Sequence, residues 1–238
     1  VRVIKNDYND SYSARGEEAF RMQENFRAFF EFFESLYRRY PDLVVENCGS
    51  GAMRSDGQML NHFALQSVSD QDDYRLYPSI VKGSLMNVRD LNAGTEEKDL
   101  IAFNFVSALA GTPYLSGRLD LLSEEGLKLV AAGVALAKNL AGFVRTAYPE
   151  LMGFSPLSER GWEAMALADE RGEEKLLYFW RLQGEENFSL PVGEGTVEQL
   201  FPPEPVRWEA GKGKLNVWLE RPFTAVLFRW KGKGREGR

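Results

Sequence analysis

The stretch Leu43-Val44-Val45-Glu46-Asn47-Cys48-Gly49-Ser50-Gly51 decides the fold, because a short apolar run ends there in polar residues and glycines. An unbroken run of this kind is typical of a strand buried in a parallel sheet. The pattern occurs twice more, where Val1–Ile4 leads into Lys5-Asn6-Asp7 and Phe63–Ser69 leads into Asp70-Gln71-Asp72-Asp73. Functional side chains of parallel α/β folds lie at the carboxyl ends of strands, so these three ends predict one site.

Helical periodicity separates and follows these runs. Aromatic residues recur at three- and four-residue steps between roughly Glu17 and Arg39, and Pro41 ends the predicted helix. Ser123 is the predicted N-cap of a long final helix. The alternation of strands and helices predicts a parallel α/β fold. The further predicted elements are helices over Ile80–Val88, Ile101–Ala110 and Ser123–Arg145, and a last strand within Gly111–Arg118.

The composition changes after about Leu151. Helical periodicity disappears, and short alternating segments such as Lys175–Leu182 and Lys214–Glu220 are separated by Gly-, Pro- and Glu-rich turns. This pattern predicts a small antiparallel β-domain over residues 154–230, after an α/β part over residues 1–153 and before a flexible basic tail over residues 231–238. We expect its tryptophans to be core residues: Trp162, Trp180, Trp208, Trp218 and Trp230.

Composition excludes several classes of function. The 238 residues carry a net charge of −6, which disfavours nucleic acid as a partner. The single histidine, His62, excludes metal sites built on two or three histidines. The single cysteine, Cys48, excludes an internal disulfide and favours a reducing, cytoplasmic location. We see no run of about 18 apolar residues and expect no membrane span.

Carboxylates therefore remain as the chemically useful groups. Retaining glycoside hydrolysis needs two of them about 5–5.5 Å apart across the scissile bond. Asp7 and Asp70 each follow a predicted parallel strand, and Lys5 lies on the same face of its strand as Asp7. Spacing alone leaves three alternatives open: an ordinary polar strand end, a solvated acidic loop, and a Ca²⁺ site at Asp70, Asp72 and Asp73.

Taken together, the clusters resemble glycoside hydrolase family 36. Lys5-Asn6-Asp7-Tyr8-Asn9 is similar to that family's K-x-D-x-N nucleophile motif, with Asn6 at a commonly apolar or aromatic position. Cys48–Asp56 resembles the family's C-x-S-G-G-x-R-x-D segment, with Ala52 replacing one glycine. Ser69-Asp70-Gln71-Asp72-Asp73 resembles its S-D-x-x-D acid/base motif. The three motifs keep the family's order and approximate spacing.

The resemblance implies the C-terminal half of a (β/α)8 TIM-type barrel followed by a β-sandwich. It implies a retaining α-galactosidase that needs neither a metal nor an organic cofactor. Asp7 would be the nucleophile and Asp70 the acid/base. The implied substrate-binding residues are Lys5, Asn9, Cys48, Gly51 and Arg54, of which Cys48 and Gly51 match positions near the 2-position of the sugar.

The family's nucleophile strand is the fourth of its barrel, whereas here it lies at the first residues. We therefore expect the chain to form homo-oligomers or to pair with a missing N-terminal portion that completes the barrel. The expected substrate is an α-galactoside oligosaccharide. Three alternatives stay open: an α-N-acetylgalactosaminidase, a transglycosylase of the same family, and a non-catalytic fragment that binds sugar or a partner chain.

Overall fold

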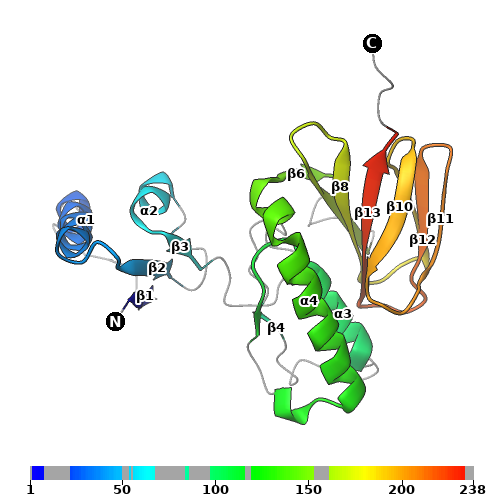
Figure 1. Ribbon diagram of the computed structural model, residues 1–238, viewed down its shortest axis with the longest axis horizontal. Helices are drawn as coiled ribbons and strands as arrows, with labels where there is room; N and C mark the ends of the chain where they lie inside the picture. The colour runs from blue at the N-terminus through cyan, green and yellow to red at the C-terminus, as the bar shows by residue number, and fades with distance from the viewer. Residues whose placement is uncertain are drawn as a thin grey trace. The chain divides into compact units, whose positions relative to one another are not determined.

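The computed structural model describes residues 2–7, 22–49, 54, 56–67, 84–85, 97–115, 119–152 and 161–233. The chain divides into two compact units, Val1–Gln71 and Asp72–Arg238 (Figure 1). Residues 153–160, where the first predicted domain boundary falls, and residues 234–238 of the predicted tail lie outside the described residues. The domains proposed from the sequence therefore stay predictions.

The first unit contains a three-stranded parallel sheet in the order β1-β2-β3. The helix α1 connects β1 to β2, and the short helix α2 connects β2 to β3. This alternation of strands and helices confirms the pattern that the sequence predicted. The elements are β1 (Val3–Asp7), α1 (Met22–Arg39), β2 (Val44–Cys48), α2 (Gly57–His62) and β3 (Leu65–Gln66).

An aromatic core lies between β2 and the two helices of this unit. Phe33 of α1, Val45 of β2 and Met59 of α2 are buried together with Phe63. The rings of Phe33 and Phe63 meet edge to face, with centroids 4.9 Å apart. The phenylalanines that predicted the helix therefore pack against the sheet, and the helices cover the face of β2 that Val45 occupies.

The second unit is built around a β-sandwich of antiparallel strands. A five-stranded sheet has the order β10-β13-β8-β7-β6, and a three-stranded sheet has the order β11-β12-β9. Their strands are β6 (Tyr148–Leu151), β7 (Trp162–Ala168), β8 (Glu174–Arg181), β9 (Asn187–Pro191), β10 (Gly195–Phe201), β11 (Arg207–Gly211), β12 (Lys214–Trp218) and β13 (Thr224–Gly232). The predicted strands near residues 175–182 and 214–220 are confirmed as β8 and β12.

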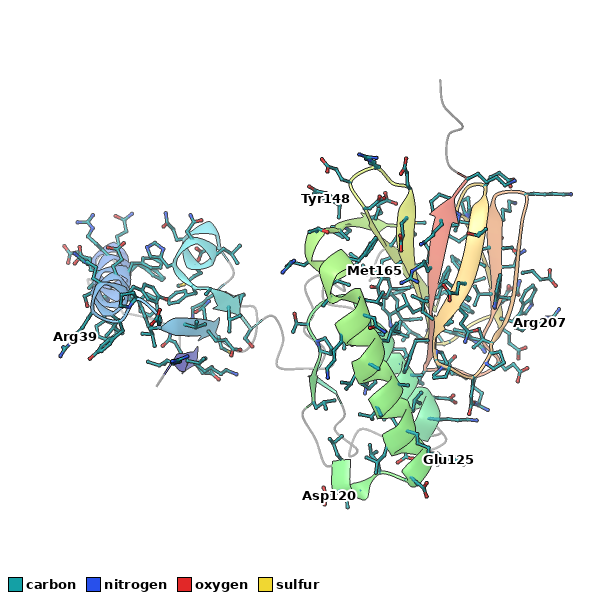
Figure 2. All side chains as sticks on the ribbon, viewed as in Figure 1. Arg39, Asp120, Glu125, Tyr148, Met165 and Arg207 are labelled. Atoms are coloured by element: carbon teal, nitrogen blue, oxygen red, sulfur yellow. The ribbon has the colours of Figure 1, made fainter. Side chains whose placement is uncertain are left out.

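The five-stranded sheet is apolar on both faces. In β8, Tyr178 and Trp180 belong to a core shared with helices, whereas Leu177 and Phe179 belong to the core between the two sheets. Met165 of β7, labelled in Figure 2, also faces the helices. Alternation along each strand thus supplies two cores from one sheet. The expected core position is confirmed for three tryptophans, which are at most 7% exposed: Trp162, Trp180 and Trp230. Trp208 and Trp218 are only half-buried, so the expectation is wrong for these two.

Two helices of this unit, α3 (Glu97–Ala108) and α4 (Glu124–Thr146), pack against one face of the five-stranded sheet (Figure 1). A short 3₁₀ helix, Leu119–Leu121, precedes α4. Ser123 caps α4 as predicted, because its Oγ accepts a hydrogen bond from the Gly126 amide at 2.9 Å.

A two-stranded parallel sheet corrects one prediction. Ser84–Leu85 form β4 and pair with β5 (Tyr114–Leu115), so the helix predicted over Ile80–Val88 is wrong at these two residues. The predicted last strand is confirmed at β5. The extended conformation of β4 depends on pairing with a segment about thirty residues further along the chain. Local periodicity does not encode such a pairing, so it could not predict the strand.

Buried polar contacts attach α3 to the sandwich. The Tyr178 hydroxyl donates to the Leu109 carbonyl at 3.1 Å, and Trp180 Nε1 donates to Ser107 Oγ at 3.0 Å. Burial raises the pKa of Tyr178 above its ordinary value, so the hydroxyl stays a neutral donor. At the surface, Arg221 binds Asp99 through two hydrogen bonds of 2.6 and 3.0 Å. The helices and the sheet are therefore joined by specific hydrogen bonds as well as by apolar packing.

Among the described residues, one helix, α4, is long and apolar enough to cross a membrane by length and composition alone. A single helix with these properties is weak evidence for a membrane span, because core helices of soluble proteins share them. Packing within the second unit explains the apolar residues on one face of α4. Val130, Gly133 and Leu140 are buried there, and the ring of Phe105 from α3 lies against Gly133.

Replacing Gly133 by Ala should destabilise the protein by about 1–3 kcal/mol, because a core that is already full does not accept an added methyl group without strain. A Cβ at Gly133 would lie 2.4 Å from the ring of Phe105. Gly142 lies on the same helix with nothing within 4 Å, so Gly142→Ala is the matched control. It should stabilise the protein by up to ~1 kcal/mol through helix propensity. Urea unfolding of both variants checks this, and equal effects would contradict the packing of α4 on α3.

Candidate active site

Asp7 ends β1 beside a lysine on the same face of the strand. Side chains two residues apart in a strand point to one side, and Lys5 Nζ lies 3.9 Å from Asp7 Oδ2. Both side chains are accessible, with 47% and 39% of their surfaces exposed. A pair this open contributes little to stability. Its chemical use is to present a carboxylate and an ammonium together at a strand end.

Cys48 stands next to Asp7 in the neighbouring strand. The two residues are register partners in the parallel pair β1-β2, so their side chains point to the same face of the sheet. Cys48 is fully buried. The Ser67 amide donates to the Asn47 carbonyl at 2.8 Å, which continues the β2-β3 pairing past β3. The carboxyl ends of the three strands therefore lie side by side, as the sequence predicted.

Arg54, six residues after the end of β2, lies against the end of that strand. Asn47 Nδ2 donates to the Arg54 carbonyl at 2.7 Å, which holds the far end of the loop against the end of β2. A Cβ at Gly49 would lie 2.8 Å from Arg54 Nε, so a larger residue there would require the arginine to move. Glycine at this position thus allows the Arg54 side chain to lie over the end of the strand.

The helix that follows this loop has a well-defined start and end. Asp56 Oδ1 accepts hydrogen bonds from the amides of Gln58 and Met59 at 2.9 and 3.1 Å, so Asp56 is the N-cap of α2. At the other end, the His62 ring lies 4.3 Å from the Phe30 ring, and its Nε2 is 3.4 Å from Glu34 Oε1. The histidine therefore connects α2 to α1.

Curated proteins related in sequence to this chain are fungal. It is 22% identical over 173 residues to probable α-galactosidase G of Aspergillus terreus, covering 68% of this chain and 24% of that protein. It is 24% identical over 174 residues to probable α-galactosidase C of Aspergillus flavus, covering 68% and 23%. The chain thus spans about a quarter of the length of the curated relatives it matches. No protein-family model matches it.

Solved structures match nearly the whole chain. The family 36 α-galactosidase AgaA from Geobacillus stearothermophilus superposes with a TM-score of 0.73 at 18% identity, covering 98% of this chain and 36% of that one. The galactosidase domain of α-galactosidase-sucrose kinase gives a TM-score of 0.71 at 20% identity, covering 97% and 34%. The chain resembles the C-terminal portion of family 36 α-galactosidases. The recognition made from three sequence motifs is confirmed, and the curated relatives are named as probable α-galactosidases.

The family 36 motifs fall partly on described residues. The structure brings together Lys5, Asp7 and Cys48 on one face of the sheet, with Arg54 folded back beside the end of β2. Asp70, Asn9 and Gly51 lie outside the described residues, as do Asp72 and Asp73 of the alternative Ca²⁺ site. The catalytic and substrate-binding roles implied by the family therefore stay predictions.

Asn47 and Gln66 support the site, although the sequence alone predicted no role for either. Asn47 is fully buried and donates to both Arg54 and Gln66. It lies one residue before Cys48, so alternation places it on the helix side of the sheet, among apolar residues such as Val45. The sequence signal that could have indicated this role is a polar residue, Asn47, at a position of a buried strand where an apolar residue is expected.

Proposed function

We propose that this chain is part of a retaining α-galactosidase that removes terminal α-linked galactose from oligosaccharides. The observation that carries the proposal is the register of β1 and β2, which puts Asp7 and Cys48 on one face of parallel strand ends, with Lys5 3.9 Å from Asp7. The relatives and structural neighbours named as α-galactosidases support it. Structures of AgaA variants in complex with raffinose and with stachyose support oligosaccharides as the substrate class.

The proposed mechanism is a double displacement. An Asp7 oxygen attacks the anomeric carbon, while Asp70 donates its proton to the glycosidic oxygen, so the leaving alcohol departs and a covalent galactosyl ester forms. Asp70, now ionised, takes a proton from water, which attacks the same carbon and releases Asp7. Two inversions give net retention. Lys5 would donate hydrogen bonds to galactose hydroxyls, and Cys48 would border the 2-position.

We further propose that the three strands of the first unit belong to a half-barrel completed in the intact protein. Among the described strands β1 is an edge, and Val3 and Ile4 on it are 55% and 39% exposed. An open edge with apolar side chains invites pairing with further strands. We propose that strands from the rest of the protein pair with this edge of β1. Homo-oligomerisation is the alternative way to protect the edge.

The proposal is tested by assaying the intact protein on 4-nitrophenyl α-galactoside and 4-nitrophenyl α-N-acetylgalactosaminide. We expect kcat/KM to favour the galactoside by at least about tenfold, which corresponds to ~1.4 kcal/mol of discrimination at the 2-position. Proton NMR of the first product should show α-galactose. A preference for the second substrate would favour the α-N-acetylgalactosaminidase alternative, and β-galactose as first product would exclude the retaining mechanism. Activity on neither substrate would contradict the proposal.

A further inference from the structure

Three amide side chains form a row across the sheet of the first unit. Asn6 of β1 is the register partner of Asn47 in β2, and Asn47 is the register partner of Gln66 in β3. Register partners in a parallel sheet point to the same face, so the three amides are neighbours. Val45, two residues before Asn47, packs under the helices. The row therefore lies on the helix side of the sheet, opposite to Asp7.

Part of this row is already hydrogen-bonded from strand to strand. Asn47 Nδ2 donates to Gln66 Oε1 at 2.8 Å and to the Arg54 carbonyl at 2.7 Å. Gln66 Nε2 in turn donates to the Ser67 carbonyl at 2.8 Å. Asn47 is fully buried, where hydrogen bonds are strong and also costly to lose. These bonds connect β2, the far end of its loop and the end of β3.

The remaining atoms of the row are complementary. Asn6 Nδ2 and Asn47 Oδ1 are both buried, and neither has a hydrogen-bond partner within the part of the chain that the structure describes. One atom is a donor and the other an acceptor, and their residues are register partners. Leaving both unpaired is unfavourable, whereas one hydrogen bond between them satisfies both.

We infer that Asn6, Asn47 and Gln66 form a continuous amide ladder in which Asn6 donates to Asn47. The ladder ties three strand ends together from behind the site. Asp7 follows Asn6 directly, and Cys48 follows Asn47 directly. Asn6 and Asn47 are thus positioning residues, which set the distance between the carboxylate of Asp7 and the loop that follows Cys48. The effect on turnover rests on the proposed function, whereas the ladder itself does not.

A double-mutant cycle in the intact protein tests the coupling. Asn6→Ala and Asn47→Ala are each expected to lower kcat for 4-nitrophenyl α-galactoside about tenfold, with a smaller change in KM, because small displacements of a reacting group reduce the chemical step. The loss in the double variant should be smaller than the product of the two losses by about fivefold, since each single change already breaks the shared hydrogen bond between Asn6 and Asn47. Losses that multiply would overturn the ladder.

Alkylation of Cys48 provides a readout that needs no activity. The thiol is fully buried at the end of β2, and Asn47 holds Arg54 against the same strand end. Asn47→Ala should raise the rate of modification by iodoacetamide, followed by mass spectrometry of the Cys48 peptide, about tenfold through local opening. Val45→Ala is the matched control, because it truncates a buried side chain on the same face of β2 without breaking a hydrogen bond.

The comparison is made at denaturant concentrations that give both variants equal stability. A rate for Asn47→Ala no higher than that for Val45→Ala would overturn the inference. If Asn47→Ala does not fold, Asn6→Ala, which removes the inferred donor, replaces it in the alkylation measurement, and Asn47→Ser replaces it in the double-mutant cycle. An intact protein without galactosidase activity would contradict the proposed function alone, because the Cys48 alkylation rate of Asn6→Ala, which removes the inferred donor to Asn47, should also rise above that of Val45→Ala and would still test the ladder.

Discussion

Replacing Asp7 by Asn in the intact protein is expected to lower kcat for 4-nitrophenyl α-galactoside by about 10⁴-fold or more, the order of loss that follows removal of a covalent nucleophile. The amide has nearly the same size as the carboxylate but does not form the galactosyl ester. The location of Asp7 at an accessible strand end, 3.9 Å from Lys5, means that the substitution removes a charge without opening a core. Initial rates and a burst-phase measurement with the aryl galactoside check the loss.

Chemical rescue makes this prediction specific. In Asp7→Ala, azide should attack the anomeric carbon from the face that Asp7 vacates, expelling 4-nitrophenolate and giving β-galactosyl azide in a single inversion. Asp42→Asn is the control, because Asp42 lies exposed in the turn before β2 and its substitution also removes one negative charge. Full turnover by Asp7→Asn, or azide rescue that yields only the α-azide, would remove Asp7 from the nucleophile role.

Replacing Asp70 by Asn is expected to have an effect that depends on the leaving group. General acid catalysis contributes about 10²–10⁴-fold, so hydrolysis of raffinose should fall by that order. Aryl galactosides with an acidic phenol need little protonation and should lose far less in the step that forms the galactosyl ester. Parallel kinetics on raffinose and on 2,4-dinitrophenyl α-galactoside measure the difference.

The pH profile of the same variant offers a second measurement. An acid must be protonated to act, so activity of the parent protein on raffinose should fall at high pH, and this alkaline limb should flatten in Asp70→Asn. Asp42→Asn should keep both limbs. Equal losses on both substrates, together with an unchanged alkaline limb, would assign Asp70 to binding rather than to proton transfer.

Much of the candidate site could be predicted because it depends on local order along the chain. Apolar runs that end in Asp7 and Cys48 predicted strand ends, and the parallel register of β1 and β2 confirms that these ends are neighbours. The roles of Asn47 and Gln66 could not be predicted, because each depends on a partner in another strand or loop. Sequence spacing shows which face a residue occupies but not which residue stands opposite to it.

The sequence by itself determined the alternation of strands and helices, the Ser123 cap, the antiparallel strands of the β-sandwich and three core tryptophans, because period, capping and burial are encoded in neighbouring residues. Only the tertiary structure decided that α3 and α4 pack on the five-stranded sheet, that Ser84–Leu85 form a strand, and that amides line up behind Asp7. Each of these features depends on contacts between segments far apart in the chain. Local propensity does not include the free energy of such contacts.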